Sequence, residues 1–478
     1  MANLIQDRIQ KLKRFEQKGI NPYPSLSFPK QPSDQALKKS IGQKAVIAGR
    51  IMLLRKMGKI AFLQIKDEFG RIQAVLNQQE LGEQNFNFFT KNLDLGDFVG
   101  IKGKRYDTKK GEKSIMAEEI TLLAKSIRPL PDKHKTLQNQ DLKLRQRYLD
   151  ILFNPEVQAM LYKKDIFWNS VRSFMKKRGF LEVETPILET VAGGADANPF
   201  VTHHQALDLD VYLRISMGEL WQKRLMVAGL EKTFEIGRQF RNEGMDQEHL
   251  QDYTQMEFYM AYADFQKGMD LVKELFRYVA QHTFGTQKFS IRGFEVNLSR
   301  EWQIYDFTKT IEQQTKINIL KTDLKTVKAK LDQLGVSYEK KGLNLSRAVD
   351  NLWKYCRKKI AGPGFLVNIP VMLSPLAKKT QNDPNLTERF HPIIAGSELG
   401  NGYSELNDPI DQAQRFKAQQ QLRDAGDQEA QMHDRAFVQA LEYGMPPVCG
   451  FGMSERVFSF LMNKSMRECQ IFPLMKPK

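Results

Sequence analysis

Long apolar runs are absent from this chain of 478 residues. No stretch of about 18 consecutive apolar residues occurs, so the sequence predicts no membrane-spanning helix. The N-terminal stretch MANLIQDRIQKLKRF is amphipathic and basic, and no apolar core with a cleavage site follows it. We therefore expect neither a signal peptide nor a membrane anchor, and we expect a cytoplasmic location.

Cysteine is scarce, and two common nucleotide-binding motifs are missing. The three cysteines, Cys356, Cys449 and Cys469, lie far apart and in no CxxC or Cys/His spacing, which disfavours a disulfide scaffold and structural zinc. We expect them to be buried free thiols. Neither GxGxxG nor GxxxxGK(S/T) occurs, so a Rossmann or P-loop nucleotide site is disfavoured.

Positive charge is abundant but unevenly distributed. Residues 1–150 hold 29 Lys and Arg against 16 Asp and Glu, which accounts for +13 of the net charge of +16. Because neutralising phosphates releases counterions, such a basic region favours a nucleic-acid partner. A lysine-rich solvent surface is the other interpretation that charge alone leaves open. At 41% hydrophobic residues, the chain is long enough for two or three domains with a large core.

The pattern along residues 1–127 predicts a helix followed by a small β-barrel. Apolar residues at helical spacing run up to Gly19, within an N-terminal helix and extension at 1–40. Residues 41–127 then hold five short strand-like runs: AVIAGRIML, IAFLQIKD, RIQAVLN, FVGIKGKRY and IMAEEITLLAK. Five such strands favour an OB-type barrel that binds single-stranded nucleic acid, with Phe62 and Gln73 as candidate contacts. Phe62 is equally compatible with a core position.

The remaining sequence predicts a linker and a larger second domain. RPLPDKHK marks a linker at 128–150, and the second domain is expected at 151–478. It begins with a helix at about 156–178 that ends at Gly179. Strands and helices then mix without a βαβ period, so the expected fold class is α+β.

Ordered blocks of the second domain resemble the motifs of one enzyme family. They are GFLEVETPIL, TFEIGRQFRNEG through YTQMEFYMAYAD, ELGNGYSELNDP, and LEYGMPPVCGFGMSER with IFPLMKP. The first, second and last blocks resemble motifs 1, 2 and 3 of class II aminoacyl-tRNA synthetases. Nearly the full chain is similar to the bacterial lysyl-tRNA synthetases, and the likeness is weakest at 285–360. The resemblance implies a catalytic domain with an antiparallel sheet flanked by helices.

The resemblance implies that an amino acid is activated with ATP, so a carboxylate must approach a phosphate. A planar guanidinium can fork to both anions, which is the role implied for Arg241. Arg456, the family's second catalytic arginine, is implied to cover the adenine ring opposite Tyr253 and to contact the γ-phosphate. Glu243 and His249 are implied to contact the adenine and the triphosphate.

A pocket for lysine needs carboxylates, because a buried ammonium must be paired, whereas a pocket for aspartate needs cations. The chain offers Glu219, Glu257 and Glu405. By resemblance, Glu219 and Glu405 bind the ε-ammonium together with the Tyr259 hydroxyl, and Glu257 binds the α-amino group. The same pocket is implied to include Asn401, Tyr403, Gly193 and Gly194, whose missing side chains permit close backbone approach.

Magnesium is the implied cofactor, bridging the phosphates of ATP. Glu398 matches a magnesium-binding glutamate, but His391 stands seven residues earlier where the family has an acidic residue. Magnesium prefers oxygen ligands, so a metal-binding role for His391 is an open question. Motif 3, GFGMSER, is one residue shorter than the common GxGxGxDR, and RISMGEL before motif 2 is one residue longer than usual.

The resemblance also implies partners. The OB domain is expected to bind the anticodon of tRNA(Lys), with Phe62 stacking on a base and Gln73 and Glu119 hydrogen-bonding to others. Motif 1 implies a homodimer with a two-fold interface near residues 157–186.

Other interpretations of the sequence are an aspartyl- or asparaginyl-tRNA synthetase, a protein-lysine ligase and a non-catalytic tRNA-binding paralogue. The acidic pocket argues against an aspartyl- or asparaginyl-tRNA synthetase, and the barrel argues against a protein-lysine ligase. The two motif arginines argue against a non-catalytic paralogue.

Overall fold

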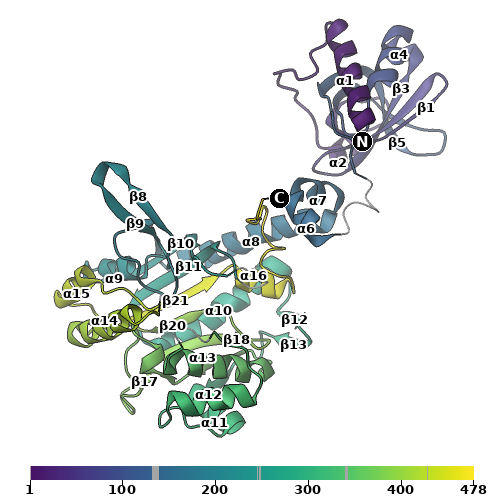
Figure 1. Ribbon diagram of the computed structural model, residues 1–478. Coiled ribbons are helices and arrows are strands. Elements are labelled where there is room, and N and C mark those ends of the chain that lie inside the picture. The colour runs from purple at the N-terminus through teal and green to yellow at the C-terminus, as the bar shows by residue number, and fades with distance from the viewer. Residues whose placement is uncertain are drawn as a thin grey trace. The chain divides into compact units, whose positions relative to one another are not determined.

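The computed structural model describes residues 2–131, 139–244, 246, 249–339, 343–427 and 429–477. The chain forms two compact units, Met1–Gln140 and Asp141–Lys478 (Figure 1). The linker expected at 128–150 lies partly outside the described residues. Its described part includes the helices α6 (Gln140–Arg145) and α7 (Arg147–Phe153).

The N-terminal unit contains the five strands that the sequence predicts. They close into a barrel in the order β1-β2-β3-β5-β4, in which only the β3–β5 pair is parallel. In β2, burial alternates from residue to residue, so Leu63 and Ile65 fill the interior while Phe62 and Gln64 face outward. The strands are β1 (Lys44–Met57), β2 (Ile60–Lys66), β3 (Arg71–Asn77), β4 (Phe98–Asp107) and β5 (Lys113–Ala124).

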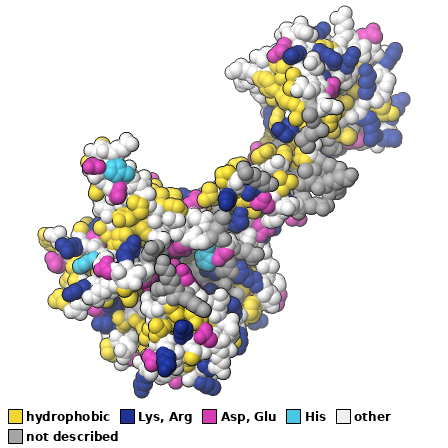
Figure 2. All heavy atoms as spheres, viewed as in Figure 1, with side chains coloured by type: hydrophobic (Ala, Val, Ile, Leu, Met, Phe, Trp, Pro, Cys, Tyr) yellow, Lys and Arg dark blue, Asp and Glu magenta, His cyan; other side chains and the backbone are white. Residues whose placement is uncertain are grey.

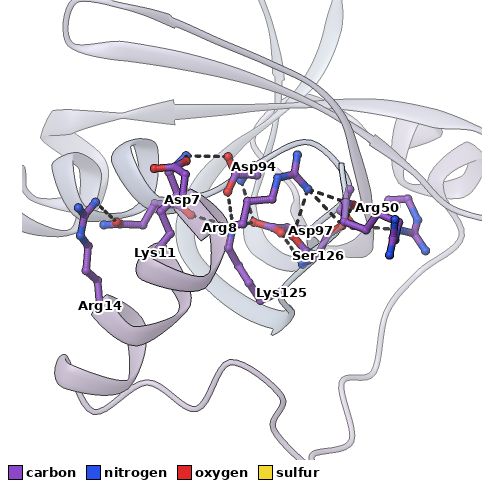
Figure 3. A network of polar contacts seen from close by, with 12 residues as sticks. Asp7, Arg8, Lys11, Arg14, Arg50, Asp94, Asp97, Lys125 and Ser126 are labelled. Carbon is purple, nitrogen blue, oxygen red and sulfur yellow. Dashed lines mark hydrogen bonds and ion pairs between the residues drawn. The ribbon is translucent and has the colours of Figure 1, made fainter. Parts of the chain in front are cut away.

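Helices cover the barrel, and a buried ion network fixes the first of them. The helices are α1 (Ala2–Gln17), α2 (Ser33–Lys38), α3 (Gln78–Leu81) and α4 (Glu83–Asn92). Lys125 at the end of β5 is fully buried and pairs with Asp94 at 2.6 Å and Asp97 at 2.7 Å (Figure 3). From α1, Lys11 reaches Asp94 at 2.8 Å and Arg8 donates to the Ser126 carbonyl. A buried charge pair of this kind is costly to break, because a lone partner would remain unpaired.

The C-terminal unit is built on a nine-stranded sheet, which runs β14-β15-β18-β20-β21-β11-β10-β6 with β19 paired to β18. Only β14–β15 and β10–β6 pair in parallel, which confirms the predicted antiparallel sheet. Its strands are β6 (Leu181–Glu182), β10 (Lys232–Phe240), β11 (Asp252–Ala261), β14 (Gln303–Asp306), β15 (Gly364–Val367), β18 (Arg389–Ile394), β19 (Ser397–Glu398), β20 (Asn401–Ser404) and β21 (Val448–Ser454).

Smaller sheets lie around this one. They are β7 (Leu188–Glu189) with β9 (Leu209–Leu213) and β8 (Val201–His204), the hairpin β12 (Lys288–Ile291) with β13 (Phe294–Asn297), and β16 (Ile369–Pro370) with β17 (Leu386–Thr387). Short 3-10 turns occur at Gln205–Leu207, Arg357–Lys359 and Val371–Leu373.

Two long helices, α8 (Pro155–Lys177) and α10 (Phe265–Phe284), pack on one face of the large sheet. The helix α8 begins after Asn154, whose side chain accepts a hydrogen bond from the Glu156 N–H, and it ends before Gly179, where φ is +79°. Alternate residues of β11, Met256, Phe258 and Met260, join α8 and α10 in the core. The intervening residues therefore face the opposite side of the sheet, where the cavity described below lies.

In the stretch 285–360, where the sequence shows no legible chemistry, the hairpin β12–β13 and the strand β14 precede three helices, α11, α12 and α13, which share a core. Trp353 on α13 is buried among Phe307, Ile311 and Leu352. The remaining helices of the unit are α9 (Glu219–Val227), α11 (Phe307–Thr315), α12 (Leu324–Gln333), α13 (Leu345–Cys356), α14 (Pro409–Asp424), α15 (Arg435–Glu442) and α16 (Arg456–Leu461).

Two expectations from what the sequence lacks are confirmed. Cys356, Cys449 and Cys469 are buried free thiols. No helix in the described part of the chain combines the length and the apolar character needed to cross a membrane.

Candidate active site

A cavity of about 360 Å³ lies over β11, β20 and β21 of the C-terminal unit. It is lined by every site residue that the sequence predicts in this unit except Gly193. Acidic side chains cluster at one end, and three arginines, a tyrosine and a histidine–glutamate pair also line the cavity. The cavity thus combines opposite charges within one space.

The acidic end holds three buried carboxylates that come from three different elements. Glu219 is the first residue of α9, Glu257 lies on β11, and Glu405 follows β20. One oxygen of Glu257 accepts hydrogen bonds from the Met217 N–H at 3.0 Å and the Gln255 amide at 2.6 Å. Its other oxygen accepts from a tyrosine hydroxyl, that of Tyr259, at 3.0 Å. Neutral donors therefore fix the orientation of Glu257.

The other two carboxylates share a cation that the sequence analysis did not identify. The ammonium of Lys223 lies 2.8 Å from Glu219 Oε1 and 2.5 Å from Glu405 Oε2. The Tyr403 hydroxyl also donates to Glu219 Oε1. Lys223 stands four residues after Glu219, a spacing that places both side chains on one face of a helix. That spacing was the sequence signal from which this contact could have been found.

Burial and crowding disfavour the ionised form of Glu257 and Glu405. Burial and the neighbouring Glu219 raise the pKa of Glu257 to about 7. Burial also raises the pKa of Glu405 well above its ordinary value, although Lys223 opposes that shift. A bound ammonium would favour the ionised carboxylates, so the acidic end is suited to a cationic guest.

Glycines give these side chains the space that they occupy. A Cβ atom on Gly452 would lie 2.9 Å from Glu257 Cγ, and one on Gly450 would collide with Glu405 and Tyr259. At Gly194, where φ is +84°, a Cβ atom would lie 2.9 Å from Glu219 Cβ. Backbone atoms therefore approach the cavity closely at these positions.

Arginines also line the cavity. Arg241 follows β10, is half-buried, and donates from Nε to the Ile215 carbonyl at 3.3 Å. Its guanidinium lies 5.9 Å from the centre of the Tyr253 ring. Arg456, the first residue of α16, donates to the Glu398 carbonyl at 3.3 Å. Arg389 on β18 lines the cavity as well and donates to the Asn401 amide oxygen at 2.9 Å.

The loop between β10 and β11 supplies further polar groups. The Arg241 N–H donates to the Gln251 carbonyl at 2.7 Å, which closes the loop at its base. Glu243 and His249 both line the cavity, and His249 Nδ1 lies 2.7 Å from an oxygen of Asp246.

His391 and Glu398 form a pair across the β18–β19 hairpin, with 3.7 Å between His391 Nδ1 and Glu398 Oε2. Burial lowers the pKa of His391 to about 4, so the imidazole is neutral at physiological pH. The pKa of Glu398 is lowered: its burial acts to raise it, but His391 and Arg357 outweigh that effect. Trp353 Nε1 donates to Glu398 Oε1 at 2.5 Å, a contact that sequence reasoning missed.

This donor set fits one magnesium ion that is held mainly by ATP. No group of three or more His, Cys, Asp or Glu side chains suited to a metal occurs among the residues that the structure describes. The anionic Glu398 is a suitable oxygen ligand, and magnesium commonly binds one or two carboxylates together with substrate phosphates and water. His391 offers only a neutral nitrogen, which magnesium disfavours.

In the N-terminal unit, the three predicted anticodon contacts lie on consecutive barrel strands, β2, β3 and β5. Phe62 is half-buried on the outer face, and Gln73 donates to the Ser114 hydroxyl at 2.9 Å. Glu119 is exposed and pairs with Lys102 at 2.8 Å. Figure 2 shows Lys and Arg side chains spread over the visible face of this unit. The barrel thus carries an aromatic ring and amides on a basic surface.

Comparisons with known proteins agree with this geometry. A family model described as tRNA synthetases class II (D, K and N) matches residues 139–476. Another, described as an OB-fold nucleic acid binding domain, matches residues 45–123 and confirms the predicted barrel type.

Three relatives share the name lysine–tRNA ligase. The protein of Thermosipho africanus (strain TCF52B) is 42% identical over 484 residues, which cover 99% of this chain and 96% of the relative. The protein of Thermotoga maritima is 40% identical, with the same coverage. The protein of Moorella thermoacetica is 41% identical and covers 100% of this chain and 98% of its own length. The chain therefore belongs to the class II tRNA synthetase family, within its group of lysine–tRNA ligases.

Proposed function

We propose that this protein attaches L-lysine to tRNA(Lys) at the expense of ATP, through a lysyl-adenylate intermediate. The observation that carries the proposal is a single cavity lined both by three buried carboxylates and by arginines, among them Arg241 and Arg456. Such a cavity can hold an amine-tipped amino acid and a polyphosphate side by side. Translation requires this reaction, so we also propose a cytoplasmic location.

In the first step, the lysine carboxylate attacks the α-phosphorus of ATP and pyrophosphate leaves. Two anions must approach each other, and Arg241 supplies a planar cation that can donate to both. Tyr253 offers one face to the adenine ring, Arg456 covers the other and contacts the γ-phosphate, and Glu243 and His249 contact the nucleotide. Rate acceleration then comes from alignment and fixed charges, without a covalent enzyme intermediate.

Lysine is selected by its two ammonium groups. The carboxylates Glu219 and Glu405, with the Tyr259 hydroxyl, bind the ε-ammonium, and Glu257 binds the α-amino group. The close backbone at Gly193 and Gly194 and the side chains of Asn401 and Tyr403 complete the pocket. An aspartate side chain would meet carboxylates there, so the aspartyl and asparaginyl alternatives are disfavoured.

Glu398 is the proposed magnesium ligand. A magnesium ion bound there with ATP would neutralise phosphate charge. The role of Glu398 is to hold an ionised oxygen for that ion, and Trp353 orients the carboxylate by its hydrogen bond. The terminal 3′ hydroxyl of tRNA then attacks the lysyl carbonyl of the adenylate, an ester bond forms, and AMP leaves.

The barrel is proposed to bind the anticodon. Phe62 stacks on a base, and Gln73 and Glu119 hydrogen-bond to others. The outward orientation of Phe62 and its position opposite the exposed Arg55 on β1 support this role. A cation next to a stacking platform suits a negatively charged single strand.

We also propose a homodimer through the region of motif 1. Apolar side chains in this part of the sequence are exposed: Tyr162 and Ile166 on α8, Leu181 on β6, and Ile187 and Leu188 at β7. Exposed apolar side chains of this kind are typical of a protein interface, and a two-fold axis would use the same residues from both subunits.

The activity is tested by ATP–pyrophosphate exchange with each of the twenty amino acids. We expect exchange that depends on lysine, and Arg241→Ala should slow it by about 10²–10³-fold, a typical loss for one preorganised donor. Arg238→Ala, on β10 just before Arg241 but outside the cavity, is the matched control. Exchange driven by aspartate or asparagine, or no exchange at all, would reject the proposed function.

Phe62→Ala should weaken charging of tRNA and leave lysine-dependent exchange intact. Stacking on one base contributes about 1–3 kcal/mol, so the KM for tRNA should rise about 10-fold or more. Phe69→Ala, which removes an exposed ring from the β2–β3 turn, is the control. Equal losses of charging and exchange would show that Phe62 supports the fold instead.

His391→Glu should lower the magnesium concentration at which exchange is half-maximal, by about 10-fold, because a second carboxylate adds an oxygen ligand. Titration of exchange with magnesium chloride at fixed ATP measures this. His282→Glu, an exposed histidine on α10, controls for added negative charge. An unaltered titration would mean that position 391 does not contact the metal.

Sedimentation analysis should give twice the mass of one chain for the wild-type protein. The double variant Leu181→Asp, Leu188→Asp should shift the protein toward monomers, because it adds charge among these exposed apolar residues. Ile410→Asp, at a similarly exposed apolar residue on α14, should leave the mass unchanged. A monomeric wild-type protein with full activity would refute the dimer.

A further inference from the structure

Lys223 is a buried ammonium in the acidic cluster, although the proposed chemistry does not require it. Only 1% of its side chain is exposed, and it lies one helical turn after Glu219 on α9. It is not among the described residues that line the cavity, whereas Glu219 and Glu405 are. Lys223 therefore contacts both carboxylates from the protein interior, on the side away from the space for a substrate.

The slot that the Lys223 side chain occupies has surroundings that favour a cation. Its ammonium lies 5.4 Å from the centre of the Tyr403 ring and 5.9 Å from that of Phe437, distances at which aromatic faces attract a cation. The Tyr403 hydroxyl donates to the same Glu219 oxygen that Lys223 contacts. Two rings and two carboxylates thus surround the ammonium.

Because of this contact, the two carboxylate oxygens of Glu405 face different sides. Oε2 faces Lys223 at 2.5 Å, while Oε1 lies in the space next to Gly450, which lines the cavity. Lys223 similarly engages Oε1 of Glu219. One oxygen of each carboxylate is thereby fixed from the interior, which orients the group toward the cavity.

Lys223 also balances the negative charge of the buried carboxylates. Glu219, Glu257 and Glu405 are buried together, and a buried charge without a partner either takes up a proton or destabilises the fold. Glu257 has neutral donors, but the cationic partner of both Glu219 and Glu405 is Lys223. Without that cation, we expect Glu405 to take up a proton and lose its attraction for a substrate ammonium.

We propose that Lys223 is a positioning residue, an internal counter-cation that holds Glu219 and Glu405 in the charge and orientation needed to select an amine-tipped amino acid. This inference rests on the proposed function. The alternative is that Lys223 imitates the substrate and competes with it for the carboxylates. The two ideas predict opposite effects of removing the ammonium.

The first experiment measures lysine-dependent exchange in Lys223→Met, which keeps an unbranched side chain of similar length without the charge. The KM for lysine should rise about 10-fold or more, the scale of one lost charged contact, while the KM for ATP stays within about 2-fold. The preference for lysine over norleucine, which has the same carbon chain without the ammonium, should fall by a similar factor. Arg224→Met, at the next residue and outside the cavity, should change none of these values.

The second experiment restores the missing cation. Lys223→Ala leaves a slot that matches propylammonium, and adding it should lower the KM for lysine toward the wild-type value. Propanol, a neutral molecule of similar size, should not. Thermal melting of each variant checks that it is folded, and rescue by propylammonium in the alanine variant provides a readout if the methionine variant fails to fold.

Four results would overturn the proposal. A fall in the KM for lysine would identify Lys223 as a competitor of the substrate. An unchanged KM would show that Lys223 does not position the carboxylates. Equal rescue by propanol and propylammonium would show that Lys223 only fills space. Wild-type protein without lysine-dependent exchange would reject the proposed function itself, and the role of Lys223 with it.

Discussion

Mutual repulsion among buried carboxylates is the constraint around which this catalytic unit is arranged. Glu219, Glu257 and Glu405 share one end of a cavity, and each comes from a different element. A backbone N–H, side-chain hydroxyls and one interior ammonium hold them there. Arg241, Arg389 and Arg456 line the same cavity, so it presents groups of both signs to a substrate.

The fold could be predicted from sequence wherever a local pattern determines structure. The five strand-like runs predicted the barrel strands, and the helix expected at about 156–178 with its end at Gly179 matches α8. The cavity residues were found because their types and spacing match a motif. The contacts of Lys223 and Trp353 were not found, because each joins residues that only the tertiary structure brings together. The spacing from Glu219 to Lys223 was visible, but it would equally suit a solvent-exposed ion pair.

Trp353 also shows why a segment without recognisable chemistry can matter. It lies on α13, in the part of the chain where the family likeness is weakest, yet it donates a hydrogen bond to Glu398. Its ring is held by the separate core formed by α11, α12 and α13. The orientation of a proposed metal ligand therefore depends on the packing of helices that do not otherwise contribute to the acidic pocket.

The glycines of β21 limit how the pocket can be enlarged. Gly450 and Gly452 leave room for Glu405, Tyr259 and Glu257 because they have no side chains. Since nothing smaller than glycine exists, this wall cannot be trimmed further to admit a bulkier amino acid. Any broadening of the substrate range, by evolution or by engineering, must therefore come from other parts of the wall, which include α9, β11 and β20, because these two positions of β21 cannot become smaller.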